Sequence, residues 1–267
     1  MFQKNKILLA AVSLILGFLI GYLSAYVLKP QTLVIESPII VKVHPSALFS
    51  LPNPGLKNFS LNYSEALSNI VAVSLAGEGV LGKVKVEIRN GENRILMNTN
   101  PFVEPDTQYS VEKAVKVAQL YTNTSLNGKD VIVSFHGINA KLIGGESAGA
   151  SITAAIIAAI LNKSIKNDVV VTGTIGLDGR IGKVSGIIEK MNAAHKHNIR
   201  LFLVPKGQRY LTYYEPKVYS KELAPGFVYK EKYYVPKQID LKDYAKELNM
   251  TLEEVSTIDD VVRYMIE

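Results

Sequence analysis

Hydrophobic and polar residues alternate in short stretches of the chain, which is the pattern of half-buried β-strands. Residues 80–88 (VLGKVKVEI) show this alternation, and the Asn90-Gly91 pair after them predicts a hairpin turn with residues 94–97 as the return strand. Continuous apolar runs predict three buried strands, at residues 130–135, 168–172 and 201–204.

Apolar residues recur at helical spacing in three other segments. The first segment starts at Ser110 (SVEKAVKVAQLY), the second follows Ser147, and the third spans residues 185–198. Hairpin strands come first, and strands then alternate with helices. This order predicts an α+β fold.

The N-terminal region has a different pattern, because residues 7–28 are apolar throughout and carry no charge. A helix of that length measures about 33 Å, which is enough to cross the core of a bilayer. Lys4 and Lys6 precede it, so the tail 1–6 is expected in the cytoplasm and the remainder outside the cell membrane. The alternative is a signal peptide that is cleaved after Ala25.

Prolines dominate the next segment, residues 29–60, and they predict an extended stalk between the single-pass anchor and the folded domain at 61–267. Within that domain, residues from about 206 to 254 form an extra segment rich in tyrosine. Its role is left open between a lid, an oligomer contact and a membrane-facing patch.

Composition narrows the chemistry. The net charge is +6, but basic and acidic residues are interleaved, which gives little support to nucleic-acid binding. The chain has no cysteine, which excludes a thiol nucleophile, and its four histidines have no metal-site spacing. We therefore expect neither a metal nor a cofactor.

One stretch approaches a nucleotide-binding loop. Gly77 is followed by four residues and then Gly82-Lys83, but Val84 stands where a P-loop needs serine or threonine. An alternating strand follows it where a helix should. We interpret this stretch as a turn.

Ser147 lies among small residues in GGESAGASITAAIIAAI (144–160), directly before a helical pattern. It is either an N-cap or a nucleophile at a helix N-terminus. The stretch also matches G-x-S-x-G, which would require an acid and a histidine such as Asp178 and His195. The second candidate base, besides that histidine, is Lys190. It lies at the edge of an apolar helix face, although helix geometry alone favours a lysine whose amine stays in water.

The segment from Gly144 to Pro205 resembles the proteolytic domain of Lon proteases, which are serine–lysine peptidases. The resemblance lies in three motifs in the right order: S-A-G from Ser147, V-T-G from Val171, and a glycine–lysine–alanine stretch from Gly186 to Ala194. Upstream, NTNPFVEPDTQYSVEKAVKVA resembles stand-alone, membrane-attached Lon-like proteins of archaeal type. The final STIDDVVRYMI resembles the closing helix of the same domain.

This resemblance implies a Lon-like proteolytic fold with Ser147 as the nucleophile, Lys190 as the base and Thr172 in support. The chain is then expected to be a membrane-anchored, ATP-independent serine endopeptidase that cleaves unfolded or flexible protein segments. A homo-oligomeric ring is a further expectation. The alternatives are a non-catalytic binding protein on the same scaffold and the G-x-S-x-G hydrolase.

Overall fold

The computed structural model describes residues 55–98, 100–224 and 227–267. The expected tail, anchor and most of the stalk, up to residue 54, lie outside these residues. No helix in the described ranges has the length and apolar character of a membrane span. The domain already includes residues before Leu61, because Lys57–Asn58 (β1) pairs with Thr124–Ser125 (β6) and Phe59 lies in the core.

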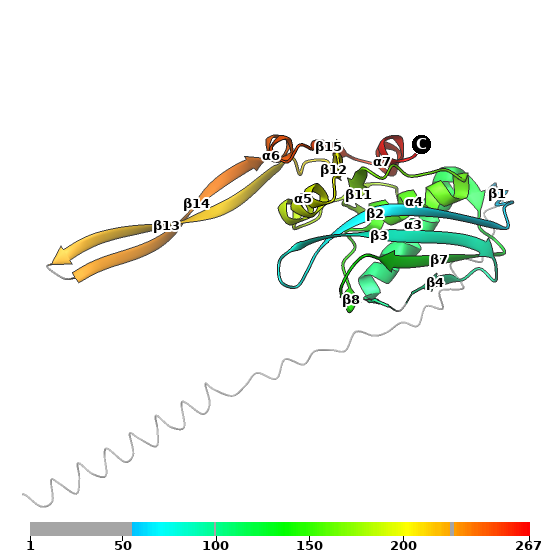
Figure 1. The fold of residues 1–267 in the computed structure, drawn as a ribbon, viewed down its shortest axis with the longest axis horizontal. Coiled ribbons are helices and arrows are strands. Elements are labelled where there is room, and N and C mark those ends of the chain that lie inside the picture. The colour runs from blue at the N-terminus through cyan, green and yellow to red at the C-terminus, as the bar shows by residue number, and fades with distance from the viewer. Residues whose placement is uncertain (1–54, 99, 225–226) are drawn as a thin grey trace, which may run out of the picture. The chain divides into compact units, whose positions relative to one another are not determined.

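The first layer is a four-stranded sheet in the order β2-β3-β7-β4 (Figure 1). Its first three strands are antiparallel, and β4 runs parallel to β7. Burial alternates along β3, where Val84, Val86 and Ile88 face the core. The strands are Tyr63–Val73 (β2), Gly79–Asn90 (β3), Lys129–His136 (β7) and Ile95–Met97 (β4).

The predicted hairpin partner of β3 is wrong. The chain does turn after Asn90, but β4 pairs with β7 and makes no ladder with β3. The reason is Asp130 on β7, whose carboxylate accepts hydrogen bonds from the Glu92 and Arg94 amides and from the Arg94 guanidinium. These contacts hold the segment before β4 over the end of β7. The guanidinium also lowers the pKa of Asp130 to about 2.

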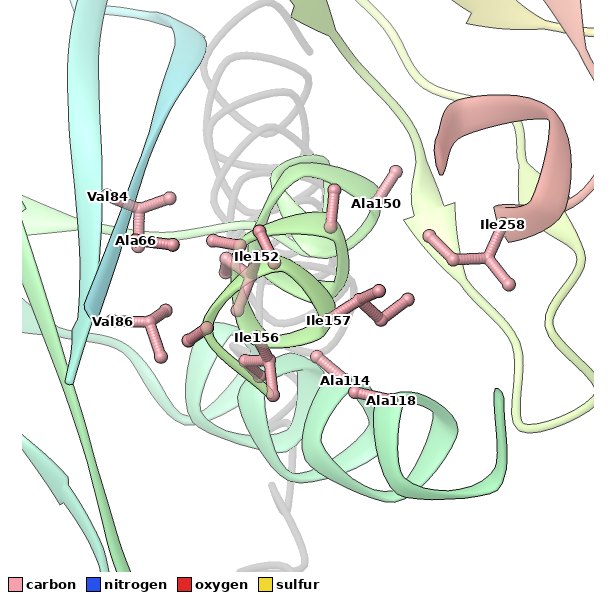
Figure 2. Packing of buried hydrophobic residues seen from close by; sticks show 14 of the residues in the cluster. Ala66, Val84, Val86, Ala114, Ala118, Ala150, Ile152, Ile156, Ile157 and Ile258 are labelled. Atoms are coloured by element: carbon pink, nitrogen blue, oxygen red, sulfur yellow. The ribbon is translucent and has the colours of Figure 1, made fainter. Parts of the chain in front are cut away.

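Two helices cover one face of this sheet. Helix α3 (Pro105–Thr122) begins five residues before the predicted start at Ser110, because Pro105 occupies its first turn. Helix α4 (Gly149–Leu161) is buried on nearly every side. Figure 2 shows Ile152 and Ile156 of α4 near the sheet residues Ala66, Val84 and Val86, with Ala114 and Ala118 of α3 beside the helix. This all-round apolar helix is the centre of the core.

A second sheet is parallel, in the order β15-β12-β9. Its strands are Val169–Val171 (β9), Leu201–Pro205 (β12) and Thr251–Val255 (β15). Helices α5 (Ile187–Lys196), α6 (Leu241–Glu247) and α7 (Ile258–Met265) lie near it in Figure 1. The antiparallel layer followed by alternating strands and helices confirms the α+β prediction.

The tyrosine-rich segment is mostly one long hairpin, β13 (Tyr210–Ala224) and β14 (Phe227–Asp240). The expected extra segment at about 206–254 also contains β15, which pairs with β12 in the parallel sheet. Two short strand pairs complete the described fold: Phe102–Val103 (β5) with Leu142–Ile143 (β8), and Thr174–Ile175 (β10) with Ile181–Gly182 (β11).

Candidate active site

Ser147 lies in the turn directly before α4 and is partly exposed. The helix begins at Gly149 with Ala148 as its N-cap, and no side chain caps it. The N-cap interpretation of Ser147 is therefore wrong. Its carbonyl oxygen is held by the Gly173 amide at 2.9 Å and by the Thr172 hydroxyl at 3.4 Å. The turn that carries the serine is thus attached to the end of β9.

The start of α3 holds the other side of this turn. The Asp106 carboxylate accepts a hydrogen bond from the Gly145 amide at 2.9 Å, and the Thr107 hydroxyl donates to the Gly145 carbonyl at 2.9 Å. Gly145 has a φ of +91°, a conformation that favours glycine. At Gly144, a side chain would collide with the Glu104 carboxylate. Gly145 is therefore the glycine that this path into the turn requires, whereas a side chain at Gly144 would only have to displace the flexible Glu104 side chain.

Glu146 has a partner away from the candidate base. Both of its carboxylate oxygens accept hydrogen bonds from the Lys113 amine on α3, at 3.0 Å each. A carboxylate beside Lys190 would favour the protonated amine. The ion pair with Lys113 instead ties Glu146 to α3.

Lys190 is buried, with 3% of its surface exposed. Helix geometry alone favoured an amine in water, but the domain packs over this position of α5. The amine donates a hydrogen bond to the Thr172 hydroxyl at 3.1 Å. Burial lowers the pKa of Lys190 to about 8, although the neighbouring Glu189 carboxylate acts in the opposite direction. A substantial fraction of the amine is therefore neutral near pH 8.

Thr172 connects the two candidate residues. Its side chain is fully buried, and its hydroxyl contacts both the Lys190 amine and the Ser147 carbonyl. In the described ranges, no hydrogen bond joins the Ser147 hydroxyl to the Lys190 amine directly. Contacts between catalytic groups are often long before substrate binds, so the missing direct bond does not rule out this pair.

Backbone amides at this turn differ in their availability. The Gly149 amide donates to the Glu146 carbonyl, and the Ala150 amide donates to the Gly173 carbonyl. Within the described part of the chain, the Ser147 and Ala148 amides have no protein acceptor. They are the donors that an oxyanion beside Ser147 could use.

Gly79, which lies inside the near P-loop stretch, has a packing role here. Ser74 to Glu78 form the turn between β2 and β3, and Lys83 lies within β3. Gly79 faces α5 so closely that a Cβ atom would lie 1.8 Å from the Glu189 carbonyl oxygen. The absence of a side chain at Gly79 therefore sets how near β3 comes to the helix that carries Lys190.

The residues of the G-x-S-x-G alternative are not brought together. Asp178 pairs with Arg180, and His195 is exposed on α5. The strand before the serine, β8, has two residues and pairs only with β5 among the described strands. An α/β-hydrolase elbow needs a buried strand there.

Sequence reasoning missed the residues that fix the serine turn, namely Asp106, Thr107 and Lys113. They lie in NTNPFVEPDTQYSVEKAVKVA, which was noted only for its resemblance. Their spacing along α3, together with the acidic residue beside Ser147, is the signal that could have pointed to a contact between the two segments.

Comparison with known proteins shows which family this part of the chain resembles. The Lon protease (S16) C-terminal proteolytic domain matches residues 113–230, which include Ser147, Thr172 and Lys190. The Lon protease of Syntrophus aciditrophicus is 38% identical over 84 residues, which are 32% of this chain and 11% of that protein. The archaeal Lon protease of Methanocaldococcus jannaschii is 33% identical over 82 residues, or 31% and 12%.

A longer match joins this chain to the Lon protease of Campylobacter jejuni, at 32% identity over 124 residues. It covers 46% of this chain and 12% of that protein. The chain thus spans about a tenth of the length of these curated relatives. The family model that matches describes the proteolytic domain.

Proposed function

We propose that this chain, which carries a Lon-like protease domain, is a serine endopeptidase in which Ser147 is the nucleophile and Lys190 the general base. The observation that carries the proposal is the buried Lys190 amine, which contacts Thr172 beside the Ser147 turn. Its lowered pKa supports a base that is neutral at mildly alkaline pH.

The first step would be attack of the Ser147 Oγ on the peptide carbonyl carbon, with the hydroxyl proton passing to the Lys190 Nζ. A neutral amine can donate to Thr172 while its lone pair accepts this proton. The Ser147 and Ala148 amides would stabilise the oxyanion.

When the C–N bond breaks, the Lys190 ammonium would return its proton to the leaving amine. A water molecule would then hydrolyse the ester on Ser147, again with Lys190 as the base. This is the usual division of one difficult step into two easier ones.

The proposal includes two further parts that come from the sequence. Residues 7–28 would anchor the protein in the cell membrane with the domain outside the cytoplasm. Cleavage would be independent of ATP and directed at unfolded or flexible segments, because the stretch from Gly77 to Val84 supplies no phosphate loop. A homo-oligomeric ring remains part of the proposal, suggested by the family resemblance.

The test is turnover of an unstructured fluorogenic peptide by the full chain in detergent, with and without ATP and magnesium. Ser147→Ala and Lys190→Ala should each lower kcat/KM on the order of 10³-fold or more, and the double variant should lose little beyond either. Nucleotide should change nothing. Circular dichroism and thermal unfolding control for loss of fold.

Wild-type turnover by Ser147→Ala would refute the dyad, and absence of turnover in the wild type itself would favour the non-catalytic binding protein. Marked stimulation by ATP would refute only the ATP-independent part. Protease protection in intact cells tests the orientation separately, because a domain shielded until lysis would lie in the cytoplasm.

A further inference from the structure

The β13–β14 hairpin has no other structural layer beside it. Its ladder runs from Tyr210–Asp240 to Ala224–Phe227, and no third described strand joins it. Figure 1 shows the hairpin extending away from the rest of the domain. A lone two-stranded hairpin is marginally stable in water. A hairpin of this length therefore suggests a surface that something else covers.

The base of the hairpin is held by the domain. Leu211 and Ile239 pack against the core cluster around Phe202, and Arg209 forms a salt bridge with Asp240. Further along, Lys237 pairs with Glu215 at 3.0 Å. The charges of the inner half are thus satisfied within the protein.

The outer half, defined here as residues 216–221 and 228–234, exposes apolar and aromatic side chains on both faces. Val218 is 62% exposed and Tyr234 is 58% exposed, which is far more than a core would allow. The exposed large side chains of the outer half are Val218, Tyr219, Val228, Tyr229, Tyr233 and Tyr234.

Lysines alternate with these side chains. The cross-strand register puts Lys232 opposite Val218, Lys221 opposite Tyr229 and Lys217 opposite Tyr233. The Lys232 amine also lies 5.4 Å from the centre of the Tyr234 ring. Positive charge and aromatic surface therefore share the same faces.

The charge of the outer half is one-sided, with four lysines (217, 221, 230 and 232) against one acid, Glu231. Among the side chains that the structure describes, which do not include residues 222–227, none of these lysines takes part in a salt bridge, in contrast to Lys237 of the inner half. A second copy of the same surface would bring lysines against lysines. The complementary partner is anionic.

We propose that the outer half of the hairpin docks onto an anionic lipid surface, with its tyrosine rings at the headgroup level and its lysines at the phosphates. Tyrosine is enriched at membrane interfaces because its ring is apolar and its hydroxyl is polar. The outer half also has no arginine, the side chain that most often reads nucleic acid.

The docking depends on the proposed function in one respect: the proposed membrane anchor would place the hairpin near a bilayer. The contact itself uses the hairpin's own residues. Because each lysine near an anionic surface contributes measurably, the contact should depend on lipid charge and should weaken in high salt.

The chain has no tryptophan, so a single tryptophan can report on the hairpin. The full-length Tyr229→Trp protein would be reconstituted into nanodiscs of phosphatidylcholine alone or with phosphatidylglycerol, including brominated lipid as a quencher. We expect a blue-shifted, quenched emission only with phosphatidylglycerol. The matched control is Tyr109→Trp, an exposed position on α3 that should show neither effect.

Replacing the four outer lysines by glutamine should lower the ratio of docked to undocked hairpin on the order of 10²-fold, since each lysine loses its attraction to the surface. Peptide cleavage is measured in the same samples. Docking without cleavage would refute the proposed peptidase alone, and cleavage without docking would refute this inference alone.

The other outcomes are also decisive. An unchanged Tyr229→Trp spectrum in both nanodiscs, or equal shifts in both, overturns anionic docking. A shift in detergent that grows with protein concentration identifies a second copy as the partner, and a shift on adding heparin identifies an acidic polymer. If the chain does not insert into nanodiscs, the anchor fails, and the same spectra on preformed vesicles decide the docking.

Discussion

The turn that carries Ser147 and the β13–β14 hairpin are held in opposite ways. The turn is bonded on one side to Gly173 after β9 and on the other to Asp106 and Thr107 of α3. The outer half of the hairpin has strand pairing only between β13 and β14 among the described residues.

This difference in anchoring shows which part of the protein needs a fixed geometry. A nucleophile and its base must keep their geometry, so their backbone is fixed by contacts from segments distant in the sequence. A surface that meets a soft partner such as a lipid headgroup layer needs exposed side chains and reach more than fixed geometry. Four experiments can break or sharpen this comparison.

Among variants that leave Ser147 and Lys190 in place, the largest effect is expected from Gly79→Ala, far from Ser147 in the sequence. The new Cβ would meet the Glu189 carbonyl oxygen, a backbone atom, and would push α5 and Lys190 away. We expect cleavage to fall on the order of 10²-fold and stability to fall by about 1–3 kcal/mol.

The matched control for that variant is Gly77→Ala in the neighbouring turn. No atom lies within 4 Å of its Cβ, although its φ of +81° adds strain. It should lose about 1 kcal/mol of stability and keep its turnover number. Equal turnover by both variants would show that the spacing of β3 and α5 does not position the base.

The second experiment is the pH profile of kcat/KM. Lys190 must be neutral to accept a proton, and its pKa is about 8. The rate should therefore rise about tenfold per pH unit below 8 and level off above. Because Glu189 raises this pKa, Glu189→Gln should shift the rise to lower pH. A flat profile between pH 6 and 9 would rule out Lys190 as the base.

The third experiment concerns the free energy of unfolding, which the buried lysine lowers. In the unfolded chain the amine keeps its proton to about pH 10.5, whereas in the folded domain it releases it at about 8. Lys190→Met should therefore be inactive and yet more stable at pH 7, by roughly 1–3 kcal/mol.

The sign of this effect has its own test. The wild type gains stability as pH rises from 8 to 10.5, so the advantage of Lys190→Met should shrink over that window. Denaturant unfolding at pH 7 and pH 10 measures both values. Lys196→Met, exposed on the same helix, should change stability by about 0.5 kcal/mol or less. A destabilised Lys190→Met would mean that the amine's bond to Thr172 outweighs its burial.

The smallest effect is expected from shortening the hairpin. Joining Glu215 to Val235, a cross-strand pair, through an Asn-Gly turn removes the outer half and keeps the base. Stability should change by about 0.5 kcal/mol or less, and cleavage of a short peptide should stay within about twofold, because the outer half has no described contact with the site. A large loss of peptide turnover would show that the hairpin contributes to the candidate active site, and the comparison between the two regions would then be wrong.

Local patterns in the sequence determined much of the fold. The strand β3 and the helix α5 follow from one-face periodicity, and β7, β9, β12 and α4 follow from apolar runs that suit elements buried on most sides. The family motifs singled out Ser147, Thr172 and Lys190, which the fold brings to one place.

Tertiary structure alone decided the rest, because it depends on contacts between segments far apart in the sequence. The hydrogen bonds of Asp130 hold the chain before β4 near β7, so β4 does not pair with β3. Helix α3 begins at Pro105, and its first turn therefore reaches the serine turn. Lys190 became buried only when the domain packed over α5. No local rule predicts such burial, since the same helix position in water would leave the amine solvated and protonated.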